Sequence, residues 1–186
     1  MFIEQLSGVY VYHILLAFLF AALVVIIPGY IMVCRKNEYS WKDVLISYFA
    51  LVYIGIVLII TIFRREPGSK SGKIVPYIVL GSLRGSYFNV RLFIYALLNV
   101  ALFVPYGVLV RFVRKSDSFL RGVVMTLLMS FVFSFFIECM QKITKTGVFE
   151  LTDIFTNATG GLIGAILGSI MLYFFRRVMV AKRNGK

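Results

Sequence analysis

Residues 119–141 read FLRGVVMTLLMSFVFSFFIECMQ, an apolar run with few interruptions. A helix crosses the hydrocarbon core of a bilayer with about 20 apolar residues, so this run is long enough to span a membrane. Lipid offers the backbone no hydrogen-bonding partners, and an isolated segment satisfies its own backbone only as a helix. The run therefore predicts a transmembrane helix.

Four more runs of this kind accompany it, approximately at residues 13–33, 44–63, 91–112 and 157–175. Hydrophobic residues make up 60% of the 186 residues and charged residues only 15%, which is too little polar surface to cover a water-facing globule. The sequence predicts an all-α integral membrane protein, in which residues 1–186 form a single domain with a bundle of about five transmembrane helices. Pro28-Gly29 is predicted to kink or end the first helix.

The connections between the runs are short except for residues 64–90, which contain five Lys and Arg and are followed directly by Arg91. Within this connection the apolar stretch Ile74–Leu80 is too short to span, so we expect an interfacial or re-entrant segment there. A polar loop, KITKTGVFELTD, precedes the fifth helix, and residues 176–186 form a basic tail.

The net charge of +12 reflects twenty Lys and Arg against eight Asp and Glu. These basic residues fall in clusters between the apolar runs, where they act as topology signals and contact membrane lipids, so nucleic acid is not an expected partner. Twelve Lys and Arg flank the helices on the side of the C-terminus and eight on the other side. This difference favours an outside N-terminus and a cytoplasmic C-terminal tail.

The fourth run contains the residues least expected in lipid. Ser134, Glu138 and Gln141 are spaced i, i+4 and i+7, so they share one helix face. A carboxylate within a membrane helix is costly unless it is paired, hydrated or protonated. We predict a polar cluster that faces the bundle interior and opens to the outer surface. The alternative is a Glu138 that is solvated at headgroup depth or paired with a neighbouring base.

The third run places Asn99 and Tyr106 seven residues apart, next to Pro105. Pro105 removes one backbone hydrogen bond and frees a carbonyl around Ala101, which needs another partner. These residues are candidates for the same polar cluster. The simpler interpretation is that Asn99 bonds to a neighbouring helix and that Pro105 is an ordinary kink.

The start of the fifth run adds Asp153 and Asn157, which lie at the same membrane face as Glu138. Either side chain could cap that helix, but their position also makes them candidates for a shared site. Gly160, Gly164 and Gly168 form a small-residue ladder that lets a neighbouring helix approach closely. Arg64 ends the second run on the same face and could bind a phosphate or carboxylate.

One histidine, His13, and two cysteines, Cys34 and Cys139, cannot build a typical metal site or a disulfide framework. The sequence also contains no phosphate-binding loop and no dinucleotide fingerprint. We therefore expect no metal and no cofactor.

Ordered motifs over residues 50–170 resemble the VanZ family. They are Lys73-Ile-Val-Pro-Tyr77, Asn99-Val-Ala-Leu-Phe-Val-Pro-Tyr-Gly107, the Ser134, Glu138 and Gln141 set, and Asp153-Ile-Phe-Thr-Asn157-Ala-Thr-Gly-Gly161. The sequence departs from the family pattern at Lys73, Val148 and Glu150.

The resemblance implies a bacterial plasma-membrane protein associated with resistance to lipoglycopeptides such as teicoplanin. Such a protein would act at the outer face on the drug or on its lipid-linked cell-wall target, and it would bind through Asn99, Tyr106, Ser134, Glu138, Gln141, Asp153, Asn157 and Arg64. The alternative is an intramembrane enzyme on a lipid-linked envelope substrate, with Glu138 or Asp153 as general acid or base. A channel or carrier ranks below both, and the oligomeric state stays open.

Overall fold

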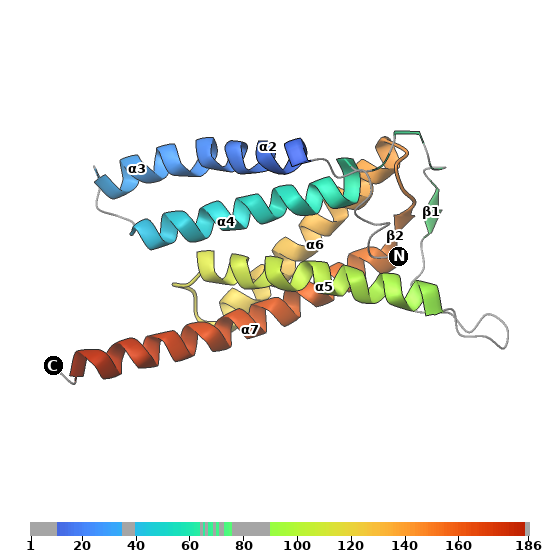
Figure 1. Ribbon diagram of the computed structural model, residues 1–186. Helices are drawn as coiled ribbons and strands as arrows, with labels where there is room; N and C mark the ends of the chain where they lie inside the picture. Colours follow the sequence, from blue (N-terminus) through green and yellow to red (C-terminus); the bar gives the residue numbers. More distant parts are fainter. Residues whose placement is uncertain are drawn as a thin grey trace.

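The computed structural model describes residues 11–34, 40–63, 65, 67–68, 70, 73–75 and 90–184. The elements are α2 (Val11–Ala21), the π-helical turn η1 (Ala22–Ile26), α3 (Ile27–Cys34), α4 (Trp41–Leu58), the π-helical turn η2 (Ile59–Phe63), β1 (Ile74–Val75), α5 (Val90–Val113), α6 (Phe119–Ile143), β2 (Phe149–Glu150) and α7 (Leu151–Asn184). Figure 1 shows the helices running back and forth along one common direction.

Five helical segments of the described chain are long and apolar enough to cross a membrane, which confirms the predicted bundle. They cover Tyr12–Val33, Trp41–Phe63, Val90–Val113, Phe119–Ile143 and Leu151–Ala181. The last segment starts six residues earlier than the sequence analysis predicted, because the Thr- and Asp-containing stretch that we assigned to the loop belongs to the first turn of α7. α7 also continues through the basic segment as far as Asn184.

The first span does not end at Pro28-Gly29. η1 ends at Ile26, two residues before Pro28, and α3 then contains this pair and continues the helix to Cys34. Proline cannot donate to the carbonyl four residues before it, and a widened turn adapts the backbone to the missing bond. Gly29 lies against α4, since a Cβ there would be 2.6 Å from a methyl carbon of Val44. This close approach explains a glycine at that position.

The predicted glycine ladder packs α7 tightly against α5. A Cβ on Gly160 would lie 2.3 Å from the carbonyl oxygen of Val100, and one on Gly164 would lie 2.1 Å from that of Val104. Side chains of any size would push the two backbones apart, so the glycines permit the contact. Replacing either glycine with alanine would force these helices to separate.

An apolar core lies between α4, η2, α5 and α6. Phe103, Tyr106 and Phe133 pack together there, and the rings of Tyr106 and Phe133 stack with 5.1 Å between their centroids. The Tyr53 hydroxyl on α4 donates to the carbonyl oxygen of Leu102 at 2.8 Å. This bond supplies a partner close to the backbone gap that Pro105 opens in α5.

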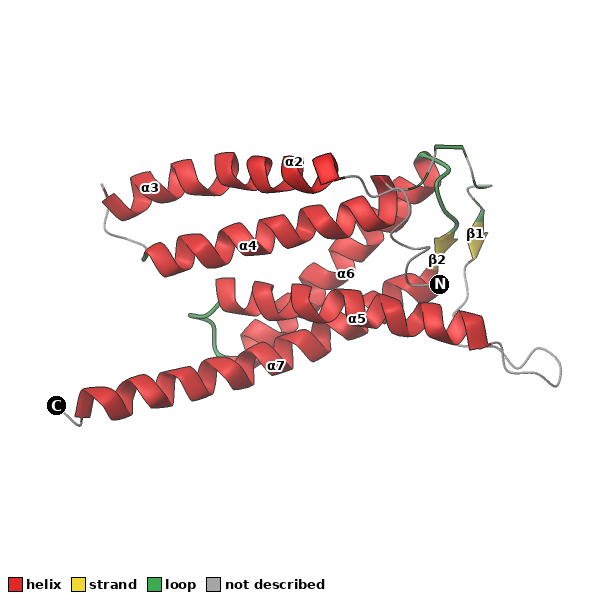
Figure 2. Ribbon diagram, in the orientation of Figure 1, coloured by secondary structure: helices red, strands yellow, loops and turns green. Residues whose placement is uncertain are grey.

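The bundle has two distinct ends, visible in Figure 2. One carries the strands β1 and β2 together with the loop between α6 and β2, and we call it the β-ladder end. The other carries the connection between α5 and α6, and we call it the Arg111 end after a buried side chain described below. α7 links the two ends along its length.

Candidate functional site

Backbone hydrogen bonds join the second loop to the loop after α6 at the β-ladder end. β1 pairs in parallel with β2, with Ile74 opposite Phe149 and Val75 opposite Glu150. The Phe149 amide donates to the carbonyl oxygen of Lys73 at 2.9 Å, and the Lys70 amide donates to that of Lys145 at 2.8 Å.

The apolar stretch of the second loop therefore begins as a strand. Ile74 and Val75 form β1, whereas residues 76–80 lie outside the described residues. The interfacial or re-entrant course of this stretch stays a prediction.

Glu138 lies inside the β-ladder end, with only 1% of its surface exposed. Its Oε2 accepts a hydrogen bond of 2.9 Å from the backbone amide of Glu150, at the end of β2. The Glu138 carboxylate also interacts electrostatically with Asp153, Glu150 and Arg65. The short ladder thus delivers one backbone donor and one further carboxylate to the polar face of α6.

Asp153 and Asn157 reach the same region from the first two turns of α7. The Asn99 side chain on α5 donates a hydrogen bond to Asp153. One turn further along α7, Nδ2 of Asn157 donates to Oγ of Ser134 on α6 at 2.8 Å. α7 begins at Leu151, so Asp153 and Asn157 both lie within the helix. The capping role considered for Asn157 is therefore wrong.

Gln141 and Arg65 join this region to η2 and to the loop after α6. Nε2 of Gln141 donates to the carbonyl oxygen of Thr61 in η2 at 3.2 Å, and Nη1 of Arg65 donates to that of Thr146 at 3.3 Å. Gly147 lies between them, since a Cβ there would be 2.5 Å from Oε1 of Gln141 and 3.0 Å from Nη1 of Arg65. The glycine allows the loop to lie over both side chains.

The charges of this cluster are incompletely compensated. Glu138, Glu150 and Asp153 supply three carboxyl groups, and among the described residues none of them lies within 4 Å of a basic group. Arg65 acts on all three electrostatically. Burial raises the pKa of the Glu150 carboxyl, and Arg65 opposes that rise. Oδ1 of Asn157, a side chain only 4% exposed, also has no hydrogen-bond partner in the described part of the chain.

The structure brings together six of the sequence-predicted site residues, namely Asn99, Ser134, Glu138, Gln141, Asp153 and Asn157. Tyr106 lies in the aromatic core, where Phe103 and Phe133 surround its ring. Arg64 lies outside the described residues. The guanidinium that reaches the cluster belongs to Arg65, whose backbone amide donates to the carbonyl oxygen of Ile62. This placement could not be read from the sequence.

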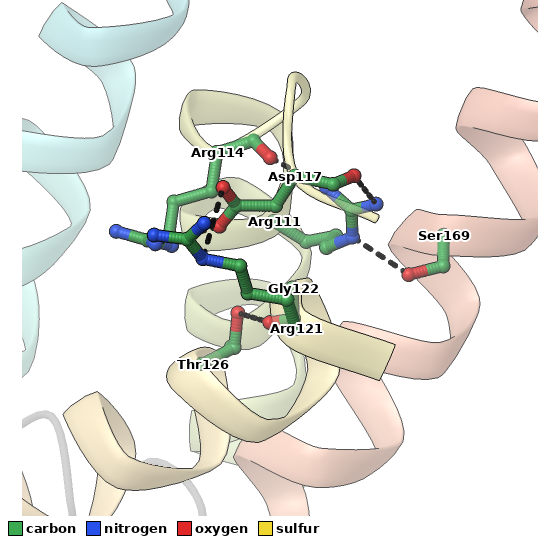
Figure 3. A network of polar contacts seen from close by, with 7 residues as sticks. All are labelled: Arg111, Arg114, Asp117, Arg121, Gly122, Thr126 and Ser169. Carbon is green, nitrogen blue, oxygen red and sulfur yellow. Dashed lines mark hydrogen bonds and ion pairs between the residues drawn. The ribbon is translucent and has the colours of Figure 1, made fainter. Parts of the chain in front are cut away.

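A second polar cluster occupies the Arg111 end (Figure 3). Arg111 is 3% exposed, and its Nε donates to Oγ of Ser169 on α7 at 2.7 Å. Its two terminal nitrogens donate to the carbonyl oxygens of Arg114 at 2.7 Å and Asp117 at 3.2 Å. The guanidinium thereby holds the turn after α5 against α7.

The acidic groups at the Arg111 end are paired. Asp117 forms an ion pair of 2.6 Å with Arg114 and a longer one of 3.9 Å with Arg121. Asp43, in the first turn of α4, pairs with Lys115. Sequence reasoning missed this network, because an arginine close to the end of an apolar run is expected to extend toward water. The signal in the sequence was Arg111, which lies inside the apolar run near its end, followed by Asp117 in the short turn after it.

Within the described residues, no group of three His, Cys, Asp or Glu side chains is arranged to hold a metal ion. The fold and the polar cluster therefore define a multi-pass membrane bundle with a buried, carboxylate-rich region at one end. A model of the VanZ/LLP1 family matches residues 48–172, and the chain belongs to this family. The match begins within α4, so it omits the first span and covers the whole polar cluster.

Among curated proteins, the chain is similar to Protein VanZ of Enterococcus faecium, with 35% identity over 66 residues. The aligned part covers 36% of this chain and 38% of the relative, so the chain spans well under half the length of that protein. No solved structure gives a significant match.

Proposed function

We propose that this protein lowers the susceptibility of a bacterial cell to lipoglycopeptide antibiotics such as teicoplanin. It acts with the β-ladder end at the outer face of the plasma membrane, on the drug or on its lipid-linked cell-wall target. Membership of the VanZ/LLP1 family supports the link to glycopeptide resistance. The observation that carries the site is the set of three carboxyl groups without an ion pair among the described residues.

Uncompensated carboxyl groups inside a membrane bundle are expensive, so their presence favours a role in binding. Asn99, Asn157 and Gln141 add amide groups to the same region, and these can both donate and accept hydrogen bonds. Glycopeptides and cell-wall precursors are both rich in amide and hydroxyl groups. Such a ligand can exchange hydrogen bonds with this cluster at the membrane surface.

The test is the teicoplanin susceptibility of cells that produce the protein, its Glu138→Gln variant or neither. Glu138→Gln keeps the shape of the side chain and removes its charge, and we expect it to abolish protection at unchanged protein level. Asp117→Asn, a matched change at the Arg111 end, serves as the control for a general effect of losing a carboxylate. Full protection by Glu138→Gln would contradict the proposal.

A second candidate is an intramembrane enzyme that modifies a lipid-linked envelope substrate. The observation that favours it is the electrostatic interaction between the carboxyl groups of Glu138 and Asp153. In such a pair one group keeps its proton and can act as the acid, while the other is ionised and can act as the base. Mass spectrometry of lipid extracts decides between the two. A new covalent product that disappears in Glu138→Gln favours the enzyme, and unchanged lipids with altered teicoplanin binding favour the non-catalytic role.

The proposed orientation places the N-terminus outside and the basic C-terminal segment in the cytoplasm. It rests on the excess of Lys and Arg at the Arg111 end. In a variant without Cys34 and Cys139, single cysteines at Lys145 and Lys115 report the two ends. An impermeant maleimide should label intact cells at position 145 and leave position 115 unlabelled, and the reverse pattern would invert the topology.

A further inference from the structure

An apolar groove of about 430 Å³ lies on the outward side of α6 at the β-ladder end. Its lining residues are Ile74, Phe135, Cys139, Lys142, Ile143 and Phe149. Ile143 is 74% exposed and Ile74 is 52% exposed, so the groove is open to its surroundings at these residues. The ring of Phe149 meets that of Phe135 edge to face at 6.0 Å and forms part of its wall.

Exposed lysines lie on the groove and on the two paired loops beside it. Lys142 lines the groove, is exposed, and has no carboxylate within ion-pair distance in the described part of the chain. Lys73 directly precedes Ile74, and the pairing of the loops brings Lys70 next to Lys145. All four lysines are exposed and belong to the β-ladder end, and we call them the basic rim.

The groove adjoins the carboxylate cluster through β2. Phe149 forms part of the groove wall. The backbone amide of the next residue, Glu150, donates a hydrogen bond to the Glu138 carboxylate in the bundle interior. Glu138 likewise precedes Cys139, which lines the groove, while its own side chain faces the bundle interior. A molecule whose chain lies in the groove would therefore carry its headgroup to the edge of the cluster.

From these observations we infer that the groove binds the apolar chain of a lipid-linked phosphate, with the phosphate on Lys142 and the basic rim. Apolar walls suit a hydrocarbon chain, and lysines suit a phosphate as flexible point charges. The source we assign is the polyprenyl phosphate or pyrophosphate lipid that carries cell-wall precursors. This inference rests on the proposed function, and it names the lipid-linked target as the bound partner.

Cys139 provides a direct readout because its thiol lines the groove and is free. In a Cys34→Ala variant, the rate at which an uncharged maleimide modifies Cys139 is measured in phosphatidylcholine nanodiscs with increasing undecaprenyl phosphate. We expect undecaprenyl phosphate to slow the modification. Undecaprenol, which lacks the phosphate, and phosphatidylglycerol, which has a different chain, should protect Cys139 much less at equal concentration.

Lys142→Gln should raise the concentration of undecaprenyl phosphate needed for half protection by about tenfold, through loss of a charge-assisted contact. Lys42→Gln, the same change on an exposed lysine of the Arg111 end, should leave that concentration unchanged. No protection, equal protection by phosphatidylglycerol or undecaprenol, or an unaltered Lys142→Gln variant would overturn the inference. The drug is absent from this assay, so a failed resistance test and a failed groove assay are separate outcomes.

Discussion

The two ends of this bundle bury charged side chains in different ways. At the Arg111 end, one guanidinium donates to three oxygen atoms, and Asp117 and Asp43 have basic partners. At the β-ladder end, three carboxyl groups interact with one arginine and lack an ion pair among the described residues. Ion-paired side chains need no ligand, whereas carboxyl groups without an ion pair have interactions left for one. The comparison supports the proposal that the β-ladder end binds a ligand and that the Arg111 end is structural.

The largest expected effect comes from removing the guanidinium at the Arg111 end. Arg111→Met keeps an unbranched chain and leaves Ser169 and two backbone carbonyls without their donor. We expect the free energy of unfolding to fall by about 3–5 kcal/mol, the usual result of breaking a buried charged network. Titration with a denaturing detergent measures it.

Glu138→Gln is the matched change at the β-ladder end. The amide can still accept the Glu150 hydrogen bond and carries no charge, so we expect a change below about 1 kcal/mol in either direction. Equal losses in Arg111→Met and Glu138→Gln would show that both ends are structural and would break the comparison.

An intermediate effect is expected from Gly164→Ala, in the stretch of α7 that joins the two ends. The added Cβ would lie 2.1 Å from the carbonyl oxygen of Val104, a backbone atom that cannot rotate away. Helices α5 and α7 must then separate, and overpacking of this kind costs about 1–3 kcal/mol.

Gly55→Ala on α4 is the control, since its Cβ would meet only the Ala17 side chain of the first span, at 2.9 Å. We expect a smaller loss of stability there, because the first span packs on one side only and can shift within the lipid. If Gly55→Ala costs as much as Gly164→Ala, the first span belongs to the rigid core.

The sequence predicted the bundle and most of the candidate cluster because both follow from simple periodicities. Apolar runs of membrane length define the spans, and the spacing of Ser134, Glu138 and Gln141 places them on one helix face. The glycine ladder was readable for the same reason.

The parts that the sequence did not reveal depend on tertiary contacts. Two-residue strands carry no periodicity, so the pairing of β1 with β2 left no signal, although it supplies the Glu150 amide to Glu138. The burial of Arg111 requires Ser169, which is 58 residues away. The early start of α7 was hidden because Thr and Asp are common both in loops and in the first turn of a helix.

A further effect, at or below that of Gly164→Ala, tests how tightly the β-ladder end is hydrogen-bonded. Ser134→Ala removes the acceptor of Asn157 and leaves a buried amide with no described partner on either atom, which should cost about 1–2 kcal/mol of unfolding free energy. Asn157→Leu removes the whole amide, including the oxygen that already lacks a partner, so we expect the double variant to recover most of that loss. A double-mutant cycle with the same detergent titration measures the coupling. If the double variant is instead less stable than either single variant, both atoms of the Asn157 amide are satisfied in the folded protein, and the β-ladder end is a structural network like the Arg111 end.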